Sequence, residues 1–331
     1  MKLDYSALNT PATQQDIAAF KAWRSTNKKS DLTLAGGKII SISVLALLAY
    51  ITFNTIASVA NSALATLILS ILATGVVIGV GIAVLRAVRA GVARQARLYK
   101  FALVNQAEYL LRVNAPAYPG MIFDEGHSRT ILDGLRLPDG TEIGNYQYVT
   151  GAGKNRRTHT WSYAGIRLNR KLPHMVLDAK HNNVFGFTNL PDDFGGQKLS
   201  LEGDFDKHFT LYAPSAYGRD ALYIFTPDVM AALIDFGRTY DIEIVDDYLL
   251  FYSTQQLTLD SQQQLESLLG VIETVSKELH DQSHRYADER AEGAALDGIA
   301  EPGRRLKKRF TILPFIIILL IFFIVNTLNN W

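Results

Sequence analysis

Residues 39–85 read IISISVLALLAYITFNTIASVANSALATLILSILATGVVIGVGIAVL and contain no Asp, Glu, Lys, Arg or His. An uncharged stretch of this length is typical of a membrane protein. As one helix it would extend about 70 Å, a little over twice the ~30 Å hydrocarbon core of a bilayer. The stretch therefore predicts a transmembrane helical hairpin over residues 39–85, with spans near 39–60 and 63–85 and a turn around Asn61.

A second apolar stretch lies near the C-terminus. Residues 315–325 are all apolar, and Pro314 precedes them in the first turns of the expected helix, where its missing N–H costs least. Trp331 has the amphipathic ring that is enriched at membrane interfaces. Residues 310–331 are therefore predicted to form a third, C-terminal transmembrane helix.

Basic residues flank the apolar spans and predict their direction. By the positive-inside rule, flanks rich in Lys and Arg face the cytoplasm. The N-terminus and residues 86–309 are then cytoplasmic and the C-terminus lies outside, which gives a multi-pass protein of the cell inner membrane. The flanking basic residues are Lys28, Lys29 and Lys38 before the first span, Arg86, Arg89, Arg94 and Arg97 after the second, and Arg304, Arg305, Lys307, Lys308 and Arg309 before the third.

Charge is distributed unevenly along the chain. Residues 1–100 hold 11 basic and 3 acidic residues, whereas residues 101–300 hold 17 and 28. The acidic body argues against nucleic acid as a partner. The sequence has no cysteine, which excludes a disulfide framework and a thiolate zinc site. Since no dinucleotide fingerprint or Ca²⁺ loop is present either, no cofactor is expected, and the lipid bilayer is the partner that the sequence indicates directly.

A stripe of small residues marks one face of the second span. Gly75, Gly79 and Ala83 recur at every fourth position, so they lie above one another on a helix. Such a stripe lets two helices approach closely. Two kinds of partner fit it: the first span of the same hairpin, or another membrane protein, including a second copy of this chain.

Residues 1–38 are predicted to be a cytoplasmic N-terminal amphipathic segment. Phe20 and Trp23 lie beside Lys21 and Arg24 in a helical pattern. This composition fits a helix on the bilayer surface, and it fits equally well a solvated helix packed on the soluble domain.

Residues 86–114 continue the second span as a predicted helical stalk. Their apolar residues keep a helical rhythm, and no Gly or Pro interrupts the pattern from Val92 to Asn114. Pro116 then ends the helical pattern.

Residues 115–285 are predicted to form a cytoplasmic α+β domain that is rich in antiparallel strands and has covering helices. Tyr146 and Tyr148 alternate with polar residues, which is typical of a half-buried strand. The predicted strands are residues 146–150, 159–168, 173–177, 198–201, 211–213 and 221–225, followed by an edge hairpin of 242–244 and 248–252 with its turn at Asp246 and Asp247.

Two helices are predicted to cover this sheet. Thr226 is the expected cap of a helix that begins with Pro227. Asp260 with Gln263 resembles a capping box before a long helix whose apolar residues recur at three and four positions. Residues 286–309 then form a predicted charged linker.

Three segments of this domain carry a resemblance to a known family. They read LPHMVLDA (172–179), LSLEGDFDKHF (199–209) and DALYIFTPD (220–228). The chain resembles a family of uncharacterised bacterial membrane proteins with two N-terminal transmembrane helices and a cytoplasmic domain of unknown function. The resemblance covers residues 160–253. It implies a bacterial inner membrane and a shared domain, assigns no catalytic residue, and does not account for the third span.

A basic cluster lies in a predicted hairpin loop. The Gly-Ala-Gly-Lys sequence there is not a phosphate loop, because the Walker spacing requires a Gly and a Ser or Thr at the positions of Tyr148 and Asn155. Lys154, Arg156 and Arg157 remain as candidate binding residues. They fit either contact with anionic lipid headgroups or a solvated loop tip.

The candidate catalytic residues are His174, Asp178, Asp204, Asp206 and His208. The last three alternate in a strand-like run, so their side chains are expected to share one face. The set forms an acid–base or metal site only if the fold brings its members together. Each residue is also ordinary in a turn or loop.

A further histidine pair has the spacing of metal ligands. His280 and His284 lie four residues apart on a predicted helix, which places both rings on one face. No HExxH pattern surrounds them and their neighbours are polar, so a solvated helix end is expected and no metal site is predicted.

The sequence as a whole predicts a binding or interaction module rather than an enzyme. Two alternatives stay open. The first is a membrane-tethered metal-dependent hydrolase that uses the His and Asp residues between 174 and 208. The second is a structural subunit of a membrane assembly that uses Gly75 and Gly79.

Overall fold

The structure of the protein is a computed structural model that describes residues 2–27, 50–51, 54, 63–183, 188–291 and 298–308. The predicted third span and almost all of the predicted first span lie outside these residues. The chain divides into two compact units, Met1–Asn105 and Gln106–Trp331. Each unit is described by itself below.

The predicted second span is part of a long helix in the first unit. Helix α4 runs over Ala63–Val104. Among the described residues it is the helix that is long and apolar enough to cross a membrane. The predicted stalk is correct up to Val104 and wrong beyond it, because residues 108–114 form a strand. The helix ends where the Asn105 side chain donates to the Phe101 carbonyl and Gln106 adopts a left-handed φ of 54°.

Two short helices pack on the C-terminal part of α4. They are α1 (Ser6–Asn9) and α2 (Gln14–Thr26). Phe20 of α2 is fully buried, and the ring of Trp23 stacks on Tyr99 of α4 with 4.7 Å between the ring centroids. The amphipathic face of the N-terminal segment is therefore covered by α4.

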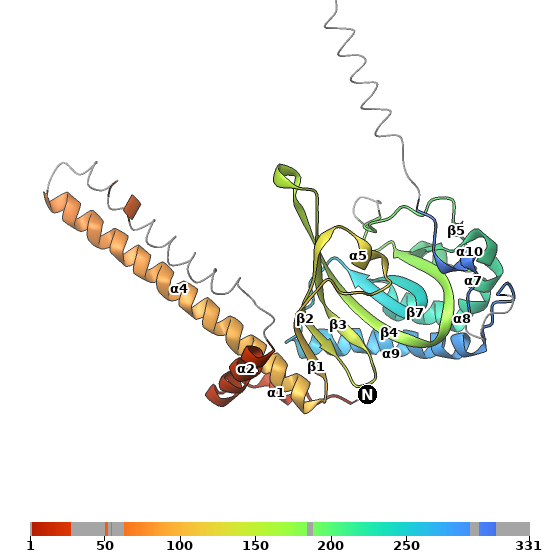
Figure 1. Ribbon diagram of the computed structural model, residues 1–331, viewed down its shortest axis with the longest axis horizontal. Coiled ribbons are helices and arrows are strands. Elements are labelled where there is room, and N and C mark those ends of the chain that lie inside the picture. The colour runs from red at the N-terminus through yellow and green to blue at the C-terminus, as the bar shows by residue number, and fades with distance from the viewer. Residues whose placement is uncertain are drawn as a thin grey trace, which may run out of the picture. The chain divides into compact units, whose positions relative to one another are not determined.

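Within the described residues of the second unit, seven strands form one sheet with antiparallel pairing (Figure 1). The strand order is β1-β2-β3-β4-β6-β5, and β7 pairs with β4. The strands are β1 (Glu108–Asn114), β2 (His127–Arg136), β3 (Glu142–Thr150), β4 (Arg157–Ala179), β5 (Lys198–Leu199), β6 (Phe209–Tyr212) and β7 (Asp241–Ser253). The predicted α+β class with a strand-rich antiparallel domain is confirmed.

Strands β4 and β7 are long and bend together. The predicted strands 159–168 and 173–177 are two parts of β4, which has β7 along one edge and first β3 and then β6 along the other. The register between β4 and β7 shifts between Arg167 and Met175, and Asp246 of β7 has a φ of 53° there. The predicted hairpin turn at Asp246 is wrong, because β4 offers hydrogen-bonding partners on both sides of this irregularity and the chain passes through it as one bent strand.

Helix α9 (Gln262–Arg285) covers one face of the sheet (Figure 1). The Ser261 hydroxyl, rather than the predicted Asp260, caps it by accepting from the Gln264 N–H. The predicted apolar stripe of this helix is largely buried. Its buried apolar residues are Leu265, Leu268, Val271, Ile272, Val275 and Leu279.

The predicted strand at residues 221–225 is wrong, because these residues lie in or next to helix α7 (Gly218–Ile224). Ala221 and Ile224 are buried, whereas the two residues between them are exposed. This spacing of three suits a helix, and a short apolar run does not reveal it. The predicted Thr226 cap is confirmed, since its side chain accepts from Val229 N–H. The other short elements here are α6 (Phe205–His208), η2 (Ser215–Tyr217), α8 (Pro227–Ala232) and η3 (Leu233–Gly237).

The other face of the sheet carries an aromatic core beneath helix α5 (Met121–Asp124). The ring of Phe123 lies 4.7 Å from Tyr146 and 5.3 Å from Tyr163, measured between ring centroids. These contacts stabilise the fold by more than the burial of apolar area alone, because aromatic rings in tilted and edge-on arrangements attract each other.

The described part of the predicted linker folds against the domain. Tyr286 donates a hydrogen bond of 2.8 Å to Asp220, and Asp288 accepts one of 2.6 Å from Tyr217. Helix α10 (Glu301–Arg304) follows. The linker prediction is therefore wrong for these residues, because Tyr286 and Asp288 are held by hydrogen bonds to the domain.

Candidate functional site

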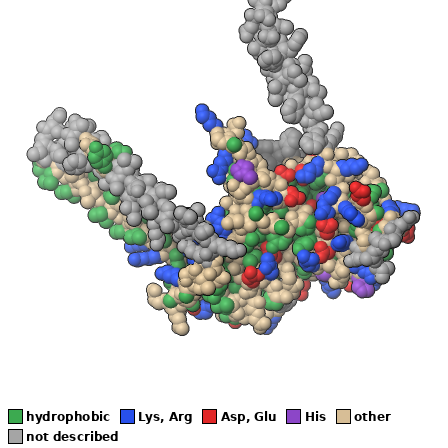
Figure 2. Space-filling view, viewed as in Figure 1, with side chains coloured by type: hydrophobic (Ala, Val, Ile, Leu, Met, Phe, Trp, Pro, Cys, Tyr) green, Lys and Arg blue, Asp and Glu red, His purple; other side chains and the backbone are tan. Residues whose placement is uncertain are grey.

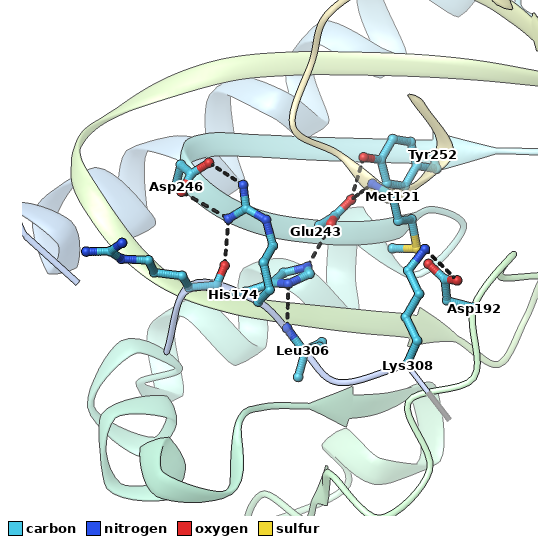
Figure 3. Close-up of polar contacts among 10 residues, drawn as sticks. Met121, His174, Asp192, Glu243, Asp246, Tyr252, Leu306 and Lys308 are labelled. Carbon is cyan, nitrogen blue, oxygen red and sulfur yellow. Dashed lines mark hydrogen bonds and ion pairs between the residues drawn. The ribbon is translucent and has the colours of Figure 1, made fainter. Parts of the chain in front are cut away.

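A buried histidine–glutamate pair lies between β4 and β7 (Figure 3). His174 Nε2 is 2.7 Å from Glu243 Oε1, and the exposed fractions of the two residues are 5% and 0%. His174 Nδ1 accepts a hydrogen bond of 2.9 Å from the Leu306 N–H. Because Nδ1 is an acceptor, the ring proton sits on Nε2 and is donated to Glu243.

Both carboxylate oxygens of Glu243 accept hydrogen bonds. Its Oε2 accepts from the Met121 N–H at 2.8 Å and from the Tyr252 hydroxyl at 2.6 Å. Burial, reinforced by the Glu243 carboxylate, raises the pKa of Tyr252 well above its ordinary value, so this hydroxyl stays a donor. A buried carboxylate is tolerated when its lone pairs are satisfied in this way. The arrangement joins α5, β4 and β7 at one point.

The same pair holds the segment that precedes the third apolar stretch. We call residues 299–308 the C-terminal clamp. Leu306 is buried in the aromatic core, and its N–H is the donor to His174. The Gln197 side chain hydrogen-bonds both the carbonyl and the N–H of Lys307, at 2.8 and 3.1 Å. The clamp is therefore fixed by backbone contacts as well as by packing.

Arg305 and Lys308 of the clamp form ion pairs with the domain (Figure 3). Arg305 donates to both carboxylate oxygens of Asp246, at 3.1 and 2.8 Å, and this guanidinium lowers the pKa of Asp246. Lys308 Nζ lies 2.9 Å from Asp192 and 3.2 Å from Glu125. Bidentate geometry makes the arginine pair the better ordered of the two.

The structure does not bring the predicted catalytic set together. His174 and Asp178 lie on the same face of β4 and are both buried. Asp204, Asp206 and His208 belong to a helical turn instead of the predicted strand. Gly203, with a φ of 74°, ends the extended backbone there, and the Asp206 carboxylate accepts from the Leu201 N–H to close a local turn.

Glu243 was missed by sequence reasoning because it lies between Ile242 and Ile244, in a segment that was predicted to be part of an edge hairpin. The two isoleucines are indeed buried, but Glu243 is buried as well. The strand is covered on both faces, and alternation alone does not reveal this. The sequence offered no signal for Leu306 either, since it lies among basic residues.

The basic hairpin tip is exposed as predicted. Strands β3 and β4 are joined by residues 151–156, which include the 3₁₀ turn η1 (Gly153–Asn155), and the hairpin projects from the sheet (Figure 1). Lys154, Arg156 and Arg157 are all exposed, and Figure 2 shows basic side chains gathered at this tip. We call these three residues the basic tip.

A cavity of about 330 Å³ lies elsewhere on the domain, beside β3 and the bend of β4. Glu142 is its central acceptor and receives hydrogen bonds from Tyr118, Tyr163 and Arg136, with the Tyr118 bond at 2.5 Å. Arg167 stacks on Tyr248 at 4.6 Å from the ring centroid. Burial, reinforced by Glu142, raises the pKa of Tyr163 well above its ordinary value, so that hydroxyl remains a donor.

The remaining candidate residues are separate from these features. His280 is partly buried on α9, and burial lowers its pKa, while His284 is exposed. Among the described residues, no group of three or more His, Cys, Asp or Glu side chains is placed to hold a metal ion. The stripe of Gly75, Gly79 and Ala83 lies on an exposed face of α4, and no described neighbour comes within 4 Å of a Cβ built at either glycine.

Comparisons with known proteins give one distant likeness. No family model matches the chain, and no curated protein matches it. A solved structure that is similar is the crystal structure of the mycobacterial trehalose monomycolate transport factor A, TtfA. The match has a TM-score of 0.37 and 10% sequence identity, and it covers 55% of this chain and 92% of that chain. A likeness at this level carries no argument about function.

Proposed function

We propose that the chain is a multi-pass protein of the cell inner membrane, and that its domain, residues 106–308, is a binding module held at the cytoplasmic surface of the bilayer. The uncharged residues 39–85, the apolar residues 310–331 and the basic flanks of both support this placement. The resemblance to uncharacterised bacterial membrane proteins supports it as well.

The observation that carries the proposal is the position of the C-terminal clamp. Its last contacts are at Lys308, immediately before the apolar stretch that begins at Phe310. The Leu306 N–H is already fixed on buried His174, so almost no free chain separates the folded domain from the predicted third span. A domain attached in this way stays near the membrane surface.

The basic tip is the surface that we propose contacts anionic lipid headgroups. Its three side chains are exposed on a projecting hairpin of an otherwise acidic domain. Each Lys or Arg near an anionic surface contributes about 1 kcal/mol, so three together contribute roughly 3 kcal/mol at low salt. Anchoring strengthens this contact further, because it keeps the tip at a high effective concentration near the membrane.

The test uses the full chain in nanodiscs. Because the natural sequence has no cysteine, Ala152→Cys places a single dye at the basic tip, and lipids that carry a headgroup quencher report contact. Gln263→Cys on the exposed side of α9 is the control label. We expect stronger quenching at position 152 than at 263 in anionic nanodiscs. Equal quenching at the two positions would contradict the proposal.

A variant separates the clamp from the tip. Arg305→Ala combined with Lys308→Ala removes two side chains whose ion pairs hold the clamp, and leaves the basic tip unchanged. Quenching at position 152 should fall in this variant if the clamp keeps the domain at the surface.

The other functions considered have less support. Of the candidate hydrolase residues, His174 and Asp178 share a face of β4, whereas Asp204 and His208 pair with each other in a helical turn, so no observation favours a hydrolase. The small-residue stripe on α4 keeps both of its proposed partners, the first span of the same hairpin and another membrane protein or a second copy of the chain.

A further inference from the structure

Two buried aspartates face the same space at the end of the β4–β7 pair. Leu177 and Ile242 are partners in the antiparallel register. Asp178 comes directly after Leu177 and Asp241 directly before Ile242, so the two aspartates lie opposite each other on neighbouring strands. Their exposed fractions are 3% and 0%. Like charges directly across two strands destabilise a sheet. A buried pair of this kind therefore needs compensation.

The protein's own donors compensate only part of this charge. Asp241 Oδ1 accepts a hydrogen bond of 2.9 Å from the Ala179 N–H, but Asp241 Oδ2 and Asp178 Oδ1 are buried without a partner. The nearest cations are engaged elsewhere: Lys180 donates to the Asp206 carbonyl, and Lys198 lies over the Tyr212 ring. An unpaired buried carboxylate oxygen is costly.

Three asparagines complete an oxygen-rich cluster. Asn182 and Asn189 lie close enough to Asp241 to lower its pKa, and Thr188 and Asn183 do the same for Asp178. The Oδ1 atoms of all three asparagines are buried and unpartnered, and so are the Nδ2 atoms of Asn182 and Asn189. Together with the two aspartates they offer five unpartnered side-chain oxygens. Such oxygens are the ligands of hard cations, and a site of carboxylates and amide carbonyls is typical of Ca²⁺, while Mg²⁺ retains more water.

We propose that Asp178, Asp241, Asn182, Asn183 and Asn189 bind a hard divalent cation, with Ca²⁺ preferred. The cation neutralises the opposed carboxylates and ties the chain that follows β4 to the start of β7. The role is structural and goes beyond the proposed membrane module. The site contains two carboxylates, fewer than the three acidic or imidazole groups of a typical catalytic metal centre, and its remaining ligands are neutral amides.

The pKa of Asp241 is consistent with this assignment. Burial, with a smaller contribution from the neighbouring Asp178 carboxylate, raises it from an ordinary value of 3.8 to about 7. A bound divalent cation stabilises the ionised carboxylate and therefore lowers this raised pKa.

The test is a calorimetric titration of the full chain in detergent micelles, stripped with EDTA, with CaCl₂ and separately with MgCl₂. We expect binding of one cation per chain and a rise of the unfolding temperature on addition. Asp241→Asn keeps the side-chain shape and should weaken binding by at least about tenfold, since even outer-shell partners of metal sites contribute this much. Asp178→Asn is the second variant, should the first fail to fold. Asp204→Asn, an exposed acid of the same domain, is the matched control and should bind like the natural chain.

Several outcomes decide the matter. Binding of Mg²⁺ with loss in Asp241→Asn supports the site and changes only the preferred ion. No heat and no thermal shift with either ion overturns it, and so does binding that Asp241→Asn and Asp178→Asn leave unchanged. In that case buried water, rather than a cation, satisfies these oxygens.

Discussion

The imidazole of His174 and the carboxylate of Glu243 lie 2.7 Å apart, and the backbone N–H of Leu306 binds the opposite side of the same imidazole. One ring therefore links the second half of the sheet to the last described segment of the chain. Its two nitrogens have different roles, since one donates to the carboxylate and the other accepts from the backbone. The predictions about the C-terminal clamp follow from this relationship.

Replacing His174 should destabilise the domain strongly. His174→Ala leaves Glu243 buried with one donor fewer, and leaves the Leu306 N–H without its acceptor. The expected loss is about 2–4 kcal/mol in the free energy of unfolding. Thermal unfolding of the full chain measures it. The control is His181→Ala, which removes an exposed histidine and should change stability by less than about 0.5 kcal/mol.

The Leu306 amide should be protected from hydrogen exchange by His174. Its N–H is buried and hydrogen-bonded to the ring, so it should exchange slowly in the natural chain. In His174→Ala we expect at least about tenfold faster exchange, which corresponds to a loss of about 1.4 kcal/mol of local stability. Mass spectrometry of a peptide covering the C-terminal clamp measures this. A peptide from α2, in the other unit, is the internal reference, and unchanged exchange in the clamp would refute the contact.

Stability without divalent cations should fall as the pH rises from about 4 to about 7. Burial raises the pKa of Asp241 to about 7, so the folded chain holds a proton that the unfolded chain releases near 3.8. Folding is therefore favoured at the acid end of this window, and the contribution is lost as the pH passes through it. Burial also raises the pKa of Asp178, with the same sign. Across this pH window the titration of Asp241 changes the free energy of unfolding by at most about 4 kcal/mol.

Denaturant unfolding in EDTA at pH 5 and pH 8 checks this prediction. The natural chain should lose more stability than Asp241→Asn between the two values. Asp204→Asn should behave like the natural chain, because its side chain is exposed. If Asp241→Asn and the natural chain lose the same amount, the account of Asp241 is wrong.

Reversing the charge of the basic tip should weaken contact with anionic membranes. The change is Lys154→Glu, Arg156→Glu and Arg157→Glu together, in the chain labelled at position 152. Headgroup quenching should fall to the level seen in neutral nanodiscs, and about 0.5 M salt should have a similar effect on the unchanged tip because it screens the attraction. A matched control reverses three other exposed basic residues of the domain, Arg219, Arg238 and Lys277. Equal losses in both triple variants would indicate net charge rather than the tip.

The sequence predicted the parts of the fold that depend on local pattern. Tyr146 and Tyr148 alternate with polar residues and lie in β3, and the Thr226 cap begins α8 as expected. The prediction of the Thr226 cap is correct because capping depends on residues that are close together in the sequence. The helix predicted over residues 108–114 is wrong because pairing with β2 in the sheet outweighs a weak helical preference.

The candidate site was less predictable for a related reason. His174 was recognised, but its partners Glu243 and Leu306 are 69 and 132 residues away along the chain. Glu243 and Asp241 both alternate with isoleucine, which indicates an exposed polar face, yet both faces of β7 are covered. Only the tertiary structure shows that this acidic side of the strand faces the interior.

The most direct test of the central claim, that the domain is held at the cytoplasmic surface of a membrane between apolar spans, is cysteine labelling of the full chain in inner-membrane vesicles. Lys154→Cys and Trp331→Cys each provide one reactive thiol in a chain that has none. A membrane-impermeant maleimide should label position 154 only in inside-out vesicles and position 331 only in right-side-out vesicles. Labelling of both positions from the same side, or recovery of the chain in the soluble fraction, would contradict the account.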